Sequence, residues 1–255
     1  MKKYQLVAFD LDDTLAPSKS PLPQRMATEL RSLLDVTEVC VISGGNFEQF
    51  DKQLLSNLEA STAQCRRLHL MPTCGTRYLR FIDDQWQHVY VRDLSSEERQ
   101  RALNALESQA KALGLWEQKT WGEILEDRGS QITFSALGQE APLEAKKAWD
   151  PTGEKKEKLR SAVAPLLPEL EVRGGGSTSV DITLRGVDKA YGINELSKQT
   201  GIPIEEMLFV GDRLDEGGND YPVLKLGIDA HAVEGWEDTA DFIAEFIREQ
   251  NTISS

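Results

Sequence analysis

Three carboxylates crowd into four positions directly behind an apolar run near the start of the chain. The stretch "LVAFDLDDTL" contains Asp10, Asp12 and Asp13. Like charges at this spacing destabilise one another unless a cation lies among them. The preceding apolar residues predict a buried strand, which would place the carboxylates at the strand's end. The alternative to a metal site is a solvated turn, which an arbitrary Asp-x-Asp usually forms.

Three further stretches place polar or flexible residues where a strand ends or a helix begins. They are "VISGG" with Ser43, Gly44 and Gly45, "DKA" with Lys189, and "VGDRLDEGGND" with Asp212, Asn219 and Asp220. Each signal alone is weak, because Ser-Gly-Gly is usually a tight turn and Asp-Lys usually a helix start. Ligands of open α/β sheets bind at the carboxyl ends of the strands, so the four stretches together predict one site.

The elements that would position these residues follow two different patterns of strands and helices. Residues 4–71 alternate short buried strands with helices, which predicts a parallel sheet with right-handed crossovers. Alternating strands around Asp83 and Arg128 then predict antiparallel hairpins with helices between them. The alternation of buried strands and helices returns after Gly186. We therefore expect a Rossmann-like α/β core of residues 1–82 and 187–255, with an inserted α+β domain of residues 83–186 that contains an antiparallel sheet.

The composition and net charge of the chain argue against some classes of partner. The 255 residues carry a net charge of −13, which argues against nucleic acid or an anionic membrane as the partner. An anionic small substrate stays possible, because a metal ion reverses the local sign of charge. The apolar run of residues 4–9 is too short for a signal peptide, no stretch has the length of a membrane span, and the three cysteines show no metal or disulfide pattern. We expect a cytoplasmic protein.

The motifs, in this order, resemble those of the haloacid dehalogenase superfamily of phosphotransferases. The inserted domain is typical of its subfamily IIB, in which a large α+β cap separates the second and third motifs. Within that branch the chain is most similar to the eukaryotic-type phosphomannomutases. The most specific feature is "GDRLDEGGNDYPV", whose long spacing between "GD" and "ND" is typical of the mutases. The resemblance covers essentially the whole chain.

The resemblance implies a role for each residue of the first motif. Asp10 would be the nucleophile that attacks phosphorus and forms an aspartyl-phosphate. Asp12 would be the general acid/base, while its backbone carbonyl binds the metal. Asp13 occupies a variable position and receives no role.

The resemblance also implies a cofactor, Mg²⁺, and a phosphate site. The metal would be bound by Asp10, the Asp12 carbonyl and Asp212, with Asn219 and Asp220 as outer supports. Phosphoryl oxygens would accept hydrogen bonds from Ser43 and from the amides of Gly44 and Gly45. Lys189 would add a positive charge between the phosphoryl group and the nucleophile.

The cap would bind the rest of the substrate. Arg128, Ser179 and Asp181 match the mutases' substrate-binding positions. Two further positions that carry phosphate-binding arginines in the mutases fall on Gln139 and Lys146. Neither residue restores the bidentate fork of an arginine.

These substitutions favour a phosphohydrolase of sugar phosphates or similar small phosphomonoesters over the alternative, a phosphomannomutase that interconverts mannose 6-phosphate and mannose 1-phosphate. A third hypothesis is a ligand-binding protein without activity. It is disfavoured because Asp10, Asp12, Lys189 and Asp212 are all present. The expected partner is a hexose phosphate. A homodimer formed through the cap is a further expectation, since relatives often dimerise that way.

Overall fold

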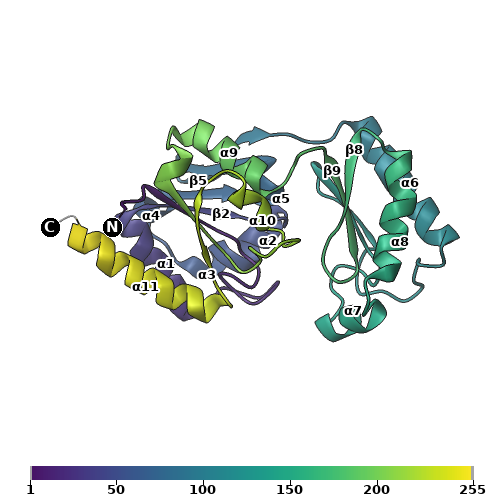
Figure 1. The fold of residues 1–255 in the computed structure, drawn as a ribbon, viewed down its shortest axis with the longest axis horizontal. Helices are drawn as coiled ribbons and strands as arrows, with labels where there is room; N and C mark the ends of the chain where they lie inside the picture. Colours follow the sequence, from purple (N-terminus) through teal and green to yellow (C-terminus); the bar gives the residue numbers. More distant parts are fainter. Residues whose placement is uncertain (1, 254–255) are drawn as a thin grey trace. The chain divides into compact units, whose positions relative to one another are not determined.

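A computed structural model describes residues 2–253 and divides the chain into two units (Figure 1). Unit 1, the core, combines Met1–Val91 with Asp188–Ser255, and unit 2, the cap, is Arg92–Val187. The core contains a large, mostly parallel sheet and the cap a separate antiparallel one. The structure therefore confirms the predicted fold class.

The core sheet has seven strands in the order β11-β10-β1-β2-β3-β4-β5. The first five in this order are parallel, and β4 and β5 are antiparallel additions at one edge. Their bounds are β1 Leu6–Phe9, β2 Glu38–Ile42, β3 Leu68–Met71, β4 Arg77–Ile82, β5 Gln85–Val91, β10 Met207–Gly211 and β11 Asp229–Ala232.

Helices cover both faces of this sheet, because successive side chains of each buried strand face opposite sides. Val7 and Phe9 pack with α1 and α11 on one face, while Leu6 and Ala8 pack with α9 on the other. Figure 1 shows α1 and α11 together below the sheet and α9 above it. The core's helical segments are α1 Gln24–Val36, α2 Phe47–Phe50, a π-helical turn Asp51–Leu55, α3 Ser56–Leu58, α4 Thr62–Cys65, α5 Pro72–Gly75, α9 Lys189–Thr200, a 3₁₀ turn Ile204–Glu206, α10 Tyr221–Leu224 and α11 Trp236–Ile253.

The cap is a four-stranded antiparallel sheet, ordered β6-β7-β9-β8, with helices on its apolar face. Phe134 and Val180 of the sheet pack against Leu106 and Leu159 of two helices, whereas Thr133 and Asp181 occupy the opposite, polar face. The cap's elements are α6 Ser96–Ala112, β6 Leu125–Asp127, β7 Gln131–Ser135, α7 Leu143–Trp149, α8 Glu154–Val163, a 3₁₀ turn Ala164–Leu166, β8 Leu170–Gly174 and β9 Ser179–Leu184.

The predicted boundary at residues 82/83 is wrong, because β5 belongs to the core. Asp83 and Asp84 both have positive φ, 50° and 58°. This two-residue turn pairs Ile82 with Gln85 and continues the ladder along β5. The chain therefore leaves the core only after Val91. The second boundary differs by one residue, since the core resumes at Asp188.

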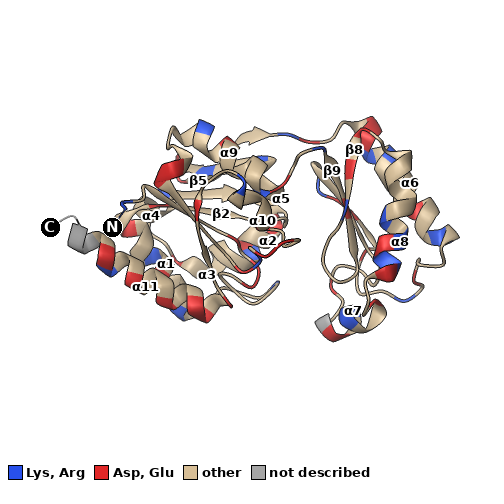
Figure 2. Ribbon diagram, viewed as in Figure 1, with Lys and Arg blue, Asp and Glu red and all other residues tan. Residues whose placement is uncertain are grey.

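The structure locates the charged residues of the cap helices and the three cysteines. Figure 2 shows acidic and basic residues interspersed along α6 and α8 of the cap. The three cysteines, Cys40, Cys65 and Cys74, are free. Among residues 2–253, no helix is long and apolar enough to cross a membrane.

Gly192 lets α9 approach α5 closely, and this contact predicts a large effect of one methyl group. A Cβ at Gly192 would lie 2.8 Å from the Cys74 carbonyl oxygen and 2.3 Å from Ile42 Cδ1. We expect Gly192→Ala to lower the free energy of unfolding by roughly 1–3 kcal/mol, although alanine favours helices. Thermal unfolding followed by circular dichroism measures this. Gly176→Ala, which adds the same methyl group where no atom lies within 4 Å, is the control; equal midpoints for both variants would contradict the packing account.

Candidate active site

The candidate site lies where the order of the core strands reverses. From β1 the chain proceeds to β2 on one side and returns later to β10 on the other. Asp10 follows β1, Asp212 follows β10 and Ser43 follows β2, so all three are at carboxyl ends of parallel strands. The Asp10 N–H donates to the Val210 carbonyl at 3.0 Å, which continues the β1–β10 pairing to the nucleophile position. This is the position where open α/β sheets bind ligands.

A buried lysine joins two aspartates at the centre of the site. Lys189 Nζ lies 2.7 Å from Asp10 Oδ1 and 2.5 Å from Asp220 Oδ1. All three side chains are nearly inaccessible. Lys189 is the first residue of α9, whose N-cap Asp188 accepts a hydrogen bond from the Tyr191 N–H. The helix start that was a weak signal in the sequence therefore delivers the lysine to the nucleophile position.

Burial and neighbouring charges raise the pKa values of Asp10, Lys189 and Asp212. Burial raises the pKa of Asp10 to about 7, and the charge of Asp220 adds to this while Lys189 opposes it. Burial would lower the pKa of Lys189, but its ion pairs with Asp10 and Asp220 outweigh burial and hold that pKa above its usual value. Burial and then the charge of Asp220 raise the pKa of Asp212. A bound divalent ion would favour the charged form of both carboxyls.

Asp10, Asp212 and Asp220 each offer an oxygen, and these oxygens lie within 4.8 Å of one another. Asp220 Oδ1 accepts from Lys189, and its Oδ2 accepts from the Arg213 N–H at 3.1 Å. Asp10 and Asp212 are therefore better placed to bind a metal directly, and the donor set suits a hard dication. Asn219, also predicted as a support, has an exposed side chain.

Thr14 holds Asp212 in this cluster and was not predicted from the sequence. Its fully buried hydroxyl donates to Asp212 Oδ1 at 3.1 Å and lies 3.1 Å from the Asp212 N–H. Thr14 closes the first motif, four residues after Asp10. The only available signal was its place in that motif.

The Ser43–Gly45 loop is held by a strained segment that was also not predicted. The carbonyls of Ser43 and Gly45 accept hydrogen bonds from the N–H groups of Cys74 and Thr73 at 2.9 and 2.8 Å. Thr73 and Cys74 have φ of 50° and 54°, in the left-handed region that such residues rarely adopt. The Ser43 side chain is buried, and its Oγ accepts from the Gly45 N–H at 3.2 Å. Nothing in "PTCG" indicates this conformation.

The Asp12 carboxylate is bound by three donors. Its Oδ1 accepts from the Lys19 N–H at 2.8 Å and from Gln53 Nε2 at 3.1 Å, and its Oδ2 accepts from Gln49 Nε2 at 2.9 Å. Neither glutamine was predicted. Asp13, which was given no role, is exposed at a left-handed position and caps a turn through the Ser18 N–H.

The predicted substrate residues of the cap lie on its polar sheet face. Asp181 on β9 is opposite Thr133, whose hydroxyl donates to Asp181 Oδ1 at 2.8 Å. Burial raises the pKa of Asp181, while Arg128 opposes the shift. Ser179 Oγ lies 3.2 Å from the Ser135 hydroxyl. Arg128 forms an ion pair with Glu126 at 2.8 Å.

Gln139 and Lys146, the two residues predicted to stand in place of arginines, are neighbours. Lys146 Nζ donates to the Gln139 carbonyl at 3.1 Å. The buried Nε2 of Gln139 has no hydrogen-bond acceptor among residues 2–253. Lys146 lies in α7.

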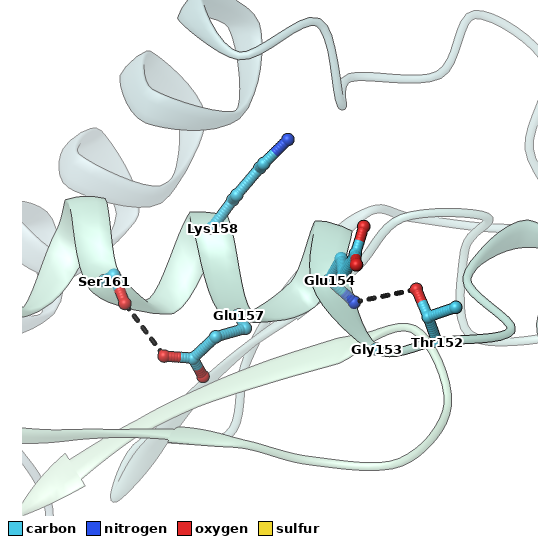
Figure 3. Close-up of a pocket in the computed structure, with 6 residues that line it drawn as sticks. All are labelled: Thr152, Gly153, Glu154, Glu157, Lys158 and Ser161. Carbon is cyan, nitrogen blue, oxygen red and sulfur yellow. Dashed lines mark hydrogen bonds between the residues drawn. The ribbon is translucent and has the colours of Figure 1, made fainter.

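None of the predicted site residues lines a surface hollow along α8. Figure 3 shows Thr152, Gly153, Glu154, Glu157, Lys158 and Ser161 lining it. A hydrogen bond from Arg160, and then one from Ser161, hold the pKa of Glu157 at about 2. The acidic, exposed hollow does not suit a phosphate.

Comparison with known proteins identifies the relatives of this chain. A family model described as eukaryotic phosphomannomutase matches residues 26–249. The phosphomannomutase of Schizosaccharomyces pombe is 25% identical over 224 residues, which cover 86% of this chain and 84% of that protein. The phosphomannomutase of Encephalitozoon cuniculi is 24% identical over 221 residues and covers 84% and 82%.

Solved structures share the fold at lower identity. Plasmodium falciparum IMP-nucleotidase superposes with a TM-score of 0.72 and 15% identity, covering 98% of this chain and 70% of that one. A haloacid dehalogenase-like hydrolase from Bacteroides thetaiotaomicron gives a TM-score of 0.61 and 16% identity, covering 96% and 100%. The core and cap therefore have the fold of haloacid dehalogenase-like hydrolases.

Removing the central ammonium tests how the site is held together. We expect Lys189→Met to lower the free energy of unfolding by about 3–5 kcal/mol, because Asp10 and Asp220 then face each other without a cation. The loss should be larger at pH 8 than at pH 5, because Asp10, whose pKa already lies at about 7, takes up a proton at pH 5 and loses its charge. Urea unfolding at both pH values measures this. Lys198→Met, on the same helix but exposed, is the control, and an equally small loss in both variants would contradict the assignment.

Proposed function

Because the chain belongs to the eukaryotic phosphomannomutase family, we propose that it moves a phosphoryl group between two hydroxyls of one hexose phosphate. The observation that carries this proposal is the buried contact of Lys189 with Asp10 at the switch point of the sheet. A carboxylate beside an ammonium and a second carboxylate, Asp212, is suited to attack phosphorus near a metal ion. The enzyme is thus a phosphotransferase of the haloacid dehalogenase type.

The residues divide the reaction between them. Asp10 attacks phosphorus as the bond from phosphorus to the sugar oxygen breaks, and Asp12 gives that oxygen a proton. In the second half Asp12 takes a proton from the accepting hydroxyl, whose oxygen attacks the aspartyl-phosphate and releases the Asp10 carboxylate. Lys189 and the Ser43 loop bind the phosphoryl oxygens. Mg²⁺, bound by Asp10 and Asp212, would neutralise charge on the transferring group.

The relatives reverse the order of preference between hydrolysis and transfer. The sequence favoured hydrolysis because Gln139 and Lys146 stand where the mutases have arginines. The family model and the curated relatives are instead phosphomannomutases over most of the chain. Hydrolysis of hexose phosphates stays as the second candidate, supported by Gln139 in the cap, whose buried Nε2 has no acceptor in the described part of the chain.

In the cap, Arg128, Ser179 and Asp181 remain the proposed contacts to the sugar and its distal phosphate. Their shared sheet face supports this proposal, because Asp181 and Thr133 are paired across neighbouring strands. Location in the cytoplasm, assembly as a homodimer and the exclusion of nucleic acid and membranes stay predictions.

A direct assay separates transfer from hydrolysis. We expect the chain to convert mannose 1-phosphate to mannose 6-phosphate faster than it releases inorganic phosphate, with both rates measured in one sample by coupled assays. Asp10→Asn should abolish both, because an amide cannot act as this nucleophile. Faster phosphate release than sugar conversion would support hydrolysis instead. Full activity in Asp10→Asn would contradict the aspartyl-phosphate.

Metal binding should depend on pH through Asp10. The folded-state pKa of Asp10, about 7, lies above its usual 3.8, so the metal-free protein loses stability as pH rises from about 4 to 7. Mg²⁺ competes with that proton. We therefore expect Mg²⁺ to raise the unfolding midpoint more at pH 8 than at pH 6. At 100-fold excess over Kd, the free energy of unfolding should rise by up to about 2.7 kcal/mol.

Thermal unfolding with Mg²⁺ or a chelator checks this prediction. Asp212→Asn is the control and should lose the gain. An equal gain at both pH values, or in Asp212→Asn, would place the metal elsewhere.

A further inference from the structure

Two glutamines that no motif singled out contact the proposed acid/base. Gln49 follows the Ser43–Gly45 loop on α2, and Gln53 lies four residues on, in the π-helical turn Asp51–Leu55. Gln53 is 3% exposed. π-Helical turns are rare and frequently occur at functional sites. Both side-chain amides donate to the Asp12 carboxylate.

The hydrogen bonds determine which way the two amides face. Gln49 Nε2 donates to Gln53 Oε1 at 3.0 Å as well as to Asp12 Oδ2. Because Gln53 Oε1 accepts this bond, Gln53 presents its Nε2 to Asp12 Oδ1. The Asn46 side chain caps the N–H of Gln49 at 2.9 Å, which fixes the start of the segment.

Gly45 is part of the same arrangement. A Cβ at this position would lie 2.3 Å from Gln49 Oε1. The glycine that ends the phosphate loop therefore leaves the space that the Gln49 carboxamide occupies. One continuous segment, residues 43–53, thus supplies the phosphate loop and both donors to Asp12.

We infer that Gln49 and Gln53 are positioning residues that present Asp12 Oδ2 to the hydroxyl that gains or loses a proton. This inference rests on the proposed function. From residues 2–253, Asp12 Oδ1 accepts two hydrogen bonds and Oδ2 accepts one, so Oδ2 retains a lone pair for the proton. The proton moves from the accepting hydroxyl to Oδ2 as its oxygen bonds to phosphorus and the bond between phosphorus and Asp10 breaks.

The Gln53 amide is not required to anchor its own segment. The Gln53 carbonyl accepts the Leu22 N–H at 2.8 Å and Asn57 Nδ2 at 3.2 Å, and both bonds survive substitution of the side chain. Methionine has nearly the same length and no donor. Gln53→Met and Gln49→Met therefore remove the contacts to Asp12 while keeping the packing.

Pre-steady-state kinetics with 4-nitrophenyl phosphate isolates the step. 4-Nitrophenolate leaves without needing a proton, so its burst reports attack by Asp10, and steady-state phosphate release reports activation of water by Asp12. We expect Gln53→Met to slow phosphate release about tenfold and to leave the burst unchanged. Gln49→Met should act in the same direction. Gln64→Met, which removes an amide bonded to Arg31 O and Asp35 far from Asp12, should match the wild type.

A double-mutant cycle shows whether the effect passes through Asp12. Asp12→Ala alone should slow phosphate release by roughly 10²–10⁴, and adding Gln53→Met should then change it less than twofold. A tenfold further loss in the double variant, or a slower burst in Gln53→Met, would overturn the inference. So would wild-type phosphate release in both glutamine variants. A wild-type protein that shows neither burst nor release, and that also fails to convert mannose 1-phosphate, would instead overturn the proposed function and this inference with it.

Discussion

The candidate active site depends on the buried ion pairs that Lys189 forms with Asp10 and with Asp220. Two carboxylates at this depth repel each other, and the ammonium is what makes their approach favourable. The three groups come from the end of β1, the first residue of α9 and the loop after β10. The chain can therefore leave the core at Val91 for almost a hundred residues, provided it returns at Asp188 in position to deliver the lysine.

Backbone contacts hold the Ser43–Gly45 loop in place. Thr73 and Cys74 keep left-handed conformations, and their N–H groups hold the Ser43–Gly45 loop. Strain of this kind persists only where neighbouring contacts enforce it, and Gly192 of α9 provides one by its contact with α5. The helix that carries Lys189 also supports the strained segment. The Ser43–Gly45 loop and Asp10 are thus positioned by the same element, α9.

The sequence predicted those parts of the fold that depend on local pattern. Apolar runs that end in Asp10, Ser43 and Asp212 identified the strand ends, and the hairpin signal around Arg128 identified β6 and β7 of the cap. What it missed depends on tertiary contacts. β5 alternates like a cap strand, and only its pairing with β4 assigns it to the core. Gln49 and Gln53 read as ordinary surface helix residues, because glutamine has no spacing signature and its partner lies about forty positions away.

The choice between water and a sugar as acceptor cannot be made by the core. In the proposed mechanism Asp10, Lys189 and the Asp12 carboxylate would perform the same proton and phosphoryl transfers whichever hydroxyl accepts. Hydrolases and mutases can therefore share one core. Discrimination has to come from groups that keep the sugar bound while it reorients, since positioning supplies much of the barrier reduction. We propose that in this chain those groups include Arg128, whose charge is already shared with Glu126, and Gln139, whose buried amide has no acceptor among residues 2–253. An amide donor can bind a hydroxyl or a single phosphate oxygen, but it adds no positive charge. A mutase built on this cap therefore has to bind the distal phosphate mainly through Arg128 and Lys146, with weaker affinity than a cluster of arginines would give.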